Sequence, residues 1–416
     1  MRLRLGAYCF CHILLLGTSL QAQWQVGASS ASISPAPGAF IAGHTLNRRF
    51  TGVHDDLFVK ALAVSDGRSS VVILTFDCIG LLYPQLQQIR QSVATCIRDD
   101  AFDASRIVMS STHTHAGPDV VGLWGPDRMQ SGVDTHYMKK LVATASEQVL
   151  RAWEARVPAR AAYAVSTHGE GWVYNISRPA QLDQSLTTLR FLNAQGRSLA
   201  TLTNFACHPT ILDGAVLEVS SDYIAGFYQH MDSLFGGVNL FLQGAIGGWV
   251  QPEHEPKQLS QALFRGRGLA EAVRQALATA RPLSGRGIFF ASQQLRLHVE
   301  NPGFRLLAQA GVIRRDIGDS VETEVAVFRV GDACFATHPG ESIPEMSHRT
   351  RALLPKEGPS FVLGLGMDAL GYILDVGFFS GDPRPPHADY LCSMSVGPAT
   401  AEAVMKAIAS LAARLR

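Results

Sequence analysis

Strand-like and helix-like segments alternate along the whole chain, and this alternation is the feature that most restricts its fold. Runs rich in β-branched and apolar residues predict strands at Ser69–Asp77 and Arg106–His115, a hairpin of Leu189–Leu192 with Leu199–Cys207, and a hairpin within Val325–Ala336. Apolar residues at helical spacing predict four helices: Pro84–Arg98, Asp134–Ala155, Gln258–Ala278 and Ala399–Arg416. No Ser/Pro-rich linker separates these elements. We therefore expect an α/β fold, with mixed β-sheets flanked by helices in a single domain.

The composition is that of an ordinary globular protein. Hydrophobic residues make up 47% of the 416-residue sequence and charged residues 17%, which is enough for one extensive core. The 36 Lys and Arg residues are balanced by 35 Asp and Glu residues. Proteins that bind a polyphosphate backbone carry a basic surplus, so we do not expect nucleic acid as a partner.

The first 22 residues have the pattern of a secretory signal peptide. Arg2 and Arg4 precede an apolar stretch that runs to Leu16, and small residues follow up to Ala22. No later run reaches the roughly 18 apolar residues of a membrane span. The expected mature chain is residues 23–416, secreted or periplasmic. It keeps five of the seven cysteines, mostly in apolar contexts, so we expect buried thiols rather than a disulfide framework.

Two histidines close the predicted strand Arg106–His115. This strand is apolar up to Met109 and then becomes polar, ending in His113-Thr114-His115. Residues two apart on a strand point to the same face, so both imidazoles should approach one point, as metal binding requires. The pair alone is also compatible with two structural histidines.

Two further candidate ligands follow other predicted strands. His208 lies in the sequence NFACHPT and Glu341 in HPGE. Histidines with one carboxylate and an open coordination position are the pattern of a catalytic zinc site. Because these residues are far apart in the sequence, their spacing is not diagnostic by itself.

Five sequence blocks occur in a characteristic order: SSTHTHAGPD at 110–119, NFACHPT at 204–210, SSDYIAG at 220–226, HPGE at 338–341 and GYIL at 371–374. The segment GVHDDLFVKALAVSDG at 52–67 belongs to the same pattern. In these blocks the chain resembles the neutral, non-lysosomal ceramidase family, over nearly the whole mature length. The resemblance implies a neutral-ceramidase-like fold and a zinc-dependent amide hydrolase that uses metal-activated water.

The resemblance also implies roles for individual residues. It implies one Zn²⁺ per chain with four ligands: His113, His208, Glu341 and Tyr372. It places His115 beside the metal, Tyr390 opposite the reacting carbonyl, and Arg178 in the lining of the site. From that position we expect His115 to carry the proton from the water to the leaving amine. A buried, hydrogen-bonded tyrosine remains an alternative for Tyr372, and a surface ion pair remains one for Arg178.

Three other features have mainly structural interpretations. Asp222 precedes a helix-like stretch and either caps it, which we favour, or supports a ligating histidine. His338 is assigned a structural role. The run Gly244–Gly248 lacks the Lys and Ser/Thr of a phosphate-binding loop, so a tight turn beside the site is expected.

The chain departs from the family pattern in two places. The family carries a serine in a Gly-Asp-x-Ser-Pro block, and Gln251 stands in the corresponding stretch Gly247–Pro252. This argues against an acyl-serine intermediate and weakens the case for ceramide itself. The ceramidases also continue into an immunoglobulin-like module, whereas this chain ends after the helix at Arg416, so residues 23–416 are expected to form the catalytic domain alone.

The sequence thus predicts an exported zinc-dependent amide hydrolase that cleaves the N-acyl bond of ceramide or a related lipid. One alternative is a zinc hydrolase of small N-acetyl or O-acyl compounds. Another is an exported binding protein without catalysis. The expected partner is a small-molecule or lipid N-acyl substrate.

Overall fold

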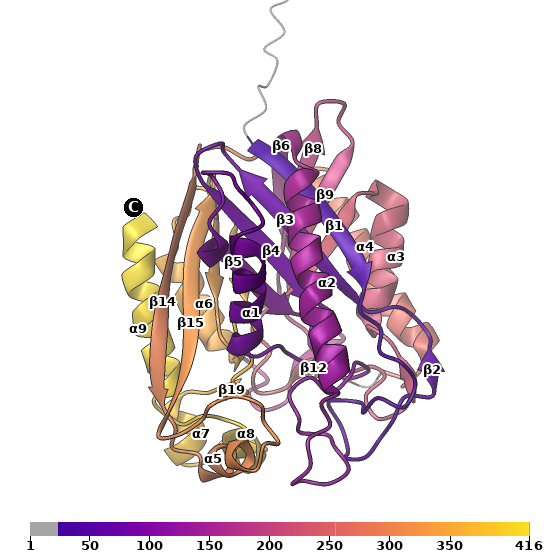
Figure 1. Cartoon of the computed structure of the whole chain (residues 1–416), viewed down its shortest axis with the longest axis vertical. Coiled ribbons are helices and arrows are strands. Elements are labelled where there is room, and N and C mark those ends of the chain that lie inside the picture. Colours follow the sequence, from indigo (N-terminus) through magenta and orange to yellow (C-terminus); the bar gives the residue numbers. More distant parts are fainter. Residues whose placement is uncertain (1–23, 254, 416) are drawn as a thin grey trace, which may run out of the picture.

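The computed structural model describes residues 24–253 and 255–415 (Figure 1). The expected signal peptide, residues 1–22, lies outside the described residues, as does Arg416 at the end of the last expected helix. Within the described part of the chain, no helix combines the length and the hydropathy that crossing a membrane would require.

The largest sheet has nine strands in the order β11-β9-β8-β6-β1-β3-β4-β5, with β13 paired to β6. The β4/β5 and β11/β9 pairs are parallel and the other pairs are antiparallel, so the sheet is mixed, as expected. Its strands are β1 (Trp24–Ser32), β3 (Phe58–Ser65), β4 (Ser70–Phe76), β5 (Ile107–Ser111), β6 (Val157–Thr167), β8 (Ser185–Asn193), β9 (Ser198–Phe205), β11 (Val238–Gln243) and β13 (Arg281–Pro282).

A second sheet has the order β14-β15-β16-β18, and three two-stranded pairs complete the fold. The four strands are β14 (Ile288–His298), β15 (Ser320–Val330), β16 (Ala333–Thr337) and β18 (Ser360–Leu363). The pairs are β10 (Glu218–Val219) with β2 (Gly52–Val53), β12 (Val250–Pro252) with β7 (Val173–Asn175), and β17 (Glu341–Ser342) with β19 (Tyr372–Ile373).

The helices cover the sheets on their outer faces. Helices α1 and α2 lie over one face of the large sheet, α3 and α4 pack together beside β8 and β11, and α9 lies along β14 and β15 (Figure 1). The helices are α1 (Tyr83–Ala94), α2 (Thr135–Glu154), α3 (Tyr223–Phe235), α4 (Leu259–Leu277), α5 (Pro302–Gln309), α6 (Pro344–Leu353), α7 (Val376–Ser380), α8 (Ala388–Ser393) and α9 (Thr400–Ala412).

Strand alternation explains why both faces of each sheet are covered. On β11, Leu240 and Leu242 join the core beneath α1 and α2, whereas Phe241 joins the core of α3 and α4. On β15, Phe328 packs into the main core and Val327 packs toward α6 and α9. A strand that is buried on both faces is apolar over most of its length, as in β4, where five of the seven residues are apolar.

The expected elements are present, with one important difference. The four predicted helices correspond to α1, α2, α4 and α9, and the two predicted hairpins are β8/β9 and β15/β16. However, β5 ends at Ser111, so the predicted strand Arg106–His115 is too long. The reason is that β4 ends at Phe76, and the amides of Thr112 and His113 then bond to the Phe76 and Cys78 carbonyls in the next turn.

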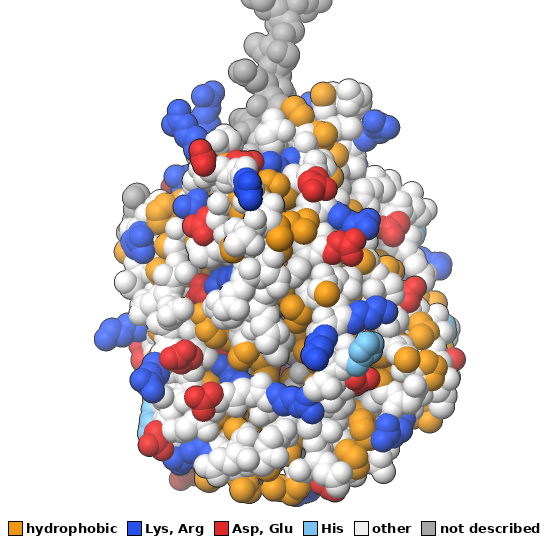
Figure 2. All heavy atoms as spheres, in the orientation of Figure 1, with side chains coloured by type: hydrophobic (Ala, Val, Ile, Leu, Met, Phe, Trp, Pro, Cys, Tyr) orange, Lys and Arg blue, Asp and Glu red, His pale blue; other side chains and the backbone are white. Residues whose placement is uncertain are grey.

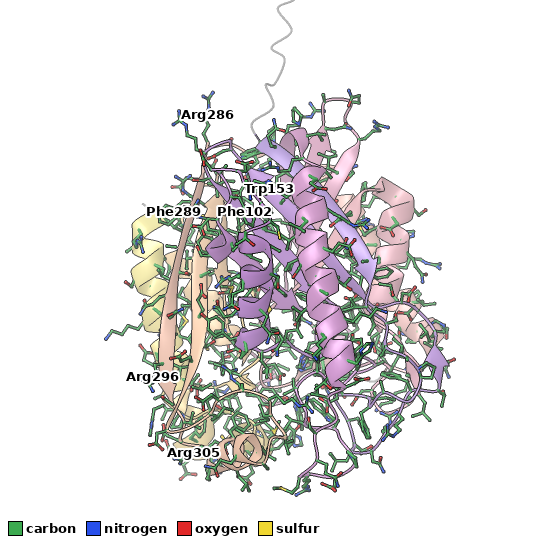
Figure 3. The ribbon with its side chains drawn as sticks, in the orientation of Figure 1. Phe102, Trp153, Arg286, Phe289, Arg296 and Arg305 are labelled. Carbon is green, nitrogen blue, oxygen red and sulfur yellow. The ribbon has the colours of Figure 1, made fainter. Side chains whose placement is uncertain are left out.

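The side chains of the described residues fit a closed core without disulfides. All five described cysteines are free. Phe102 and Trp153 pack edge to face, with ring centroids 4.9 Å apart, near the end of α2 (Figure 3). Lys, Arg, Asp and Glu are interspersed over the visible face (Figure 2), in line with the balanced charge.

A buried ion pair connects the two sheets through α1. Arg90 on α1 donates to Glu324 on β15 at 2.6 Å, and also to the Ile107 carbonyl of β5 at 2.9 Å. Both charged side chains are almost fully buried, at 8% and 3% exposure. Removing one partner leaves the other charge buried without compensation.

We therefore predict that Glu324→Ala lowers the free energy of unfolding by about 3–5 kcal/mol, as measured by urea denaturation. The control is Glu147→Ala, which breaks the exposed Glu147–Arg151 pair on α2 and should change stability by less than about 0.5 kcal/mol. Equal effects of the two substitutions would contradict the role assigned to the buried pair.

Candidate metal centre

Three histidines and a glutamate meet where strands of both sheets end. His113 and His115 follow β5, His208 follows β9, and Glu341 begins β17 just after β16. The ring centroids of His113 and His208 are 4.9 Å apart, and those of His113 and His115 are 5.1 Å apart. One ligand atom from each of the three histidines lies within 4.8 Å of the others, so these residues can hold a metal ion.

His113 is placed by the turn after β5 and not by strand alternation. Its backbone is left-handed, with φ 71°, and its amide donates to the Cys78 carbonyl at 2.9 Å. Its Nδ1 lies 2.5 Å from the Ile79 carbonyl oxygen, which can only accept, so Nδ1 carries the proton. Nε2 is therefore the unprotonated nitrogen, with its lone pair available, and it lies 3.4 Å from Oε2 of Glu341.

His208 is oriented in the same way by the opposite side of the site. Both its amide and its Nδ1 donate to the Val250 carbonyl of β12, at 2.9 and 2.8 Å. Its Nε2 lies 3.1 Å from the same Oε2 of Glu341. Two imidazoles whose Nδ1–H groups are held by carbonyl groups therefore present Nε2 to one carboxylate, the usual arrangement of ligating histidines and their supporting bonds.

Glu341 and Tyr372 are brought together by the β17/β19 pair, in which they lie directly opposite each other. Burial alone raises the pKa of Glu341, but His113 and His208 outweigh it and hold that pKa well below its usual range. Burial raises the pKa of Tyr372 far above its usual value, and the Glu341 charge raises it further. The Tyr372 hydroxyl accepts a hydrogen bond from Trp249 Nε1 at 2.9 Å.

His115 completes the histidine cluster. Its Nδ1 lies 3.2 Å from Oδ1 of Asp213, while its buried Nε2 has no hydrogen-bond partner in the described structure. Burial lowers the pKa of His115, and His113 and His208 lower it further, although Asp213 acts in the opposite direction. A neutral imidazole with a free Nε2 suits either a metal ligand or a general base.

Asp213 and Trp249 were not anticipated from the sequence. Asp213 lies in an Asp-Gly turn, a pattern that indicates local turn chemistry rather than contact with a distant histidine. Burial raises the pKa of Asp213, but its hydrogen bond and charge interaction with His115, together with the charges of His44 and Lys257, more than offset this and keep that pKa below its usual value. The only available signal was the closeness of Asp213 to the NFACHPT block.

Tyr390 and Arg178 have different surroundings. Tyr390, on α8, is 50% exposed and lines the same cavity as His113 and Glu341, with its ring 6.4 Å from that of Tyr372. Arg178 is not among the residues that line this cavity. It forms ion pairs with Glu345 and Asp375, as in the alternative interpretation of an ion-paired arginine.

The structurally interpreted residues lie around the centre. Asp222 caps α3 through the Tyr223 amide at 2.6 Å and also accepts from the Leu212 amide at 2.8 Å. His338 bonds the hydroxyls of Ser342 and Thr350, and burial lowers its pKa to about 3.

The run Gly244–Gly248 forms the turn between β11 and β12, beside the site. A Cβ at Gly247 would lie 2.4 Å from the Glu341 carbonyl oxygen, so this close approach requires glycine. Gln251, on β12, donates its side-chain amide to Glu253 at 2.5 Å.

An apolar cavity of about 90 Å³ leads away from the cluster. His113, His115, Glu341 and Tyr372 line it together with side chains from α5, from the loop before β15 and from residues 121–124. Most of the remaining wall is apolar, including Leu123, Trp124, Val299, Phe304, Ile313 and Ile317. The cavity therefore joins a set of N and O donors to a space suited to a hydrocarbon chain.

Comparisons with known proteins show which fold this is. No family model matches the sequence. The chain is similar to the neutral ceramidase from Pseudomonas aeruginosa, at 15% identity and a TM-score of 0.75, covering 95% of this chain and 74% of that one. It is likewise similar to a ceramidase complexed with C2, at 15% identity and a TM-score of 0.77, covering 95% and 75%. The chain therefore has the mixed α/β fold of bacterial neutral ceramidase.

Proposed function

We propose that this protein is an exported zinc-dependent hydrolase that cleaves the N-acyl bond of ceramide or a related N-acyl lipid. The observation that carries the proposal is the convergence of His113 Nε2 and His208 Nε2 on Oε2 of Glu341, at 3.4 and 3.1 Å, at one end of an apolar cavity. Export rests on the signal-peptide pattern of residues 1–22.

The residues present suit zinc. Two imidazole nitrogens and a carboxylate are typical zinc donors, and Tyr372 would add a phenolic oxygen. The orphaned Nε2 of His115 is a further polar atom aimed at the same cluster. Zinc supplies Lewis-acid polarisation of the amide carbonyl and makes water a better nucleophile at neutral pH.

The other residues handle protons and charge. Neutral His115, held by Asp213 through Nδ1, takes a proton from the attacking water at Nε2 and passes it to the leaving nitrogen, which must be protonated before the C–N bond breaks. Burial raises the pKa of Tyr390, so its hydroxyl stays protonated and can donate to the developing oxyanion. Arg178, paired with Glu345 and Asp375, fixes the starts of α6 and α7 near the site.

The substrate class rests on the apolar lining, which suits an acyl or alkyl chain. Hydrolysis of small N-acetyl or O-acyl compounds is the second candidate. It is favoured by Gln251 in place of the family serine and by the modest cavity of about 90 Å³, which is smaller than the roughly 150 Å³ of a cavity known to bind benzene. A series of N-acyl substrates separates the two: rates that rise with chain length support a lipid, and rates that peak at acetyl support a small substrate.

We predict that the purified protein contains close to one zinc per chain and that His113→Ala loses both the metal and hydrolysis of an N-acyl panel. Metal analysis and turnover with and without chelator measure this. His136→Ala, an exposed histidine on α2, is the matched control and should keep both. A wild-type protein with no zinc and no response to chelator would instead favour a binding protein without catalysis.

His115→Ala should keep the zinc and lower kcat by about 10²–10⁴, because the proton carrier is lost while the ligands remain. Asp213→Asn should lower kcat less, since it removes the carboxylate charge beside Nδ1 but leaves the imidazole and its Nε2 in place. Loss of zinc in His115→Ala would move His115 into the ligand set, and full activity would eliminate it as the proton carrier.

A further inference from the structure

One charged residue stands in the otherwise apolar part of the cavity wall. Arg315, in the loop between α5 and β15, lines the cavity together with Ile313 and Ile317 from the same loop. It also lines a separate surface pocket that is bordered by Gln87 and Arg296. Arg315 is therefore part of the partition between the cavity and the outer surface.

The partition is held by a buried ion pair. Nη1 of Arg315 lies 2.8 and 3.0 Å from the two carboxylate oxygens of Asp368, and Nη2 donates to the Glu322 carbonyl. The two side chains are 4% and 0% exposed. Asp368 is itself anchored, because its Oδ1 accepts from the amides of Tyr83 and Ala369 at 2.9 and 2.8 Å.

This geometry does not suit an anion-binding role for Arg315. Asp368 already neutralises its charge, and both terminal nitrogens have acceptors from the protein. A hydrocarbon chain entering the cavity also gains nothing from a charged pair, and it would have to separate that pair to pass beyond it. The Arg315–Asp368 pair therefore blocks the passage of a hydrocarbon chain and acts as part of the cavity wall.

We propose that Arg315 determines chain-length specificity: paired with Asp368, it closes the end of the cavity and limits the alkyl chain that fits beside the metal centre. This inference rests on the proposed function only in assuming that the cavity holds the alkyl chain of an N-acyl substrate. A cavity of about 90 Å³ is smaller than the roughly 150 Å³ that holds benzene, so the wall restricts the enclosed part of a chain to a short segment.

The test measures binding of saturated fatty acids of increasing length to the full-length protein by calorimetry, which requires no turnover. For wild type, affinity should rise about fourfold for each added methylene and stop rising at the length where the chain meets the wall. The double variant Arg315→Ala/Asp368→Asn opens the partition toward the surface pocket. Its asparagine Oδ1 still accepts from the Tyr83 and Ala369 amides, so no charge is left unpaired. We call the chain length at which affinity stops rising the break. In the double variant the break should move to longer chains.

Two further variants control for indirect effects. Arg296→Ala changes the surface pocket without touching the cavity, since Arg296 lies on β14 at the edge of the molecule (Figure 3), and its break should match wild type. Ile317→Phe fills the cavity from inside the wall and should move the break to shorter chains. It also keeps the inference testable if the double variant does not fold.

An unchanged break in the folded double variant, or in Ile317→Phe, would overturn the inference. Hydrolysis of N-acyl substrates is measured in parallel. Wild-type protein that shows the break and its shifts, but hydrolyses none of them, would disprove the proposed function and leave the length limit intact.

Discussion

The arrangement of the site depends on a single carboxylate oxygen. Oε2 of Glu341 faces the Nε2 atoms of both His113 and His208, and these three residues come from segments that follow strands of two different sheets. In a buried position an anion without nearby positive charge or hydrogen-bond donors is strongly unfavourable. Because each imidazole carries its proton on Nδ1, its Nε2 faces Glu341 as an acceptor, and a cation bound among the three residues would supply that compensation. The sheets must therefore pack in one register for the centre to exist.

The mixed α/β class and the long helices were predictable from the sequence, whereas the strand order and several element ends were not. Helices α2 and α4 begin and end within one residue of their predicted limits, and α9 begins within one residue of its own but ends at Ala412, because apolar stripes are local signals and helix ends are not. The predicted end of β5 was wrong, because the strand-like sequence pattern continues through His115 while the neighbouring strand β4 stops at Phe76. The histidines still converge, but through a left-handed turn at His113, which no periodicity indicates.

The residues of the candidate site likewise fall into those that the sequence predicted and those that it did not. His113, His208, Glu341 and Tyr372 were named from short sequence blocks, and they lie together because those blocks sit at strand ends. Asp213, Trp249 and Arg315 carry no such signal, since what each contacts depends on how distant loops pack. The sequence left two alternatives for Arg178, lining of the site or an ion pair, for the same reason: its two carboxylate partners are more than 150 residues away in the sequence.

The bonds that orient His113 and His208 end on main-chain carbonyls, those of Ile79 and Val250. Every residue type offers a carbonyl, so evolution can exchange the side chains at these supporting positions without turning the imidazoles. Gln251 is adjacent to one of these supports, and its side chain bonds Glu253 rather than either imidazole. The orientation of the two imidazoles is thus encoded in the path of the backbone, and it does not depend on which side chains occupy positions 79 and 250.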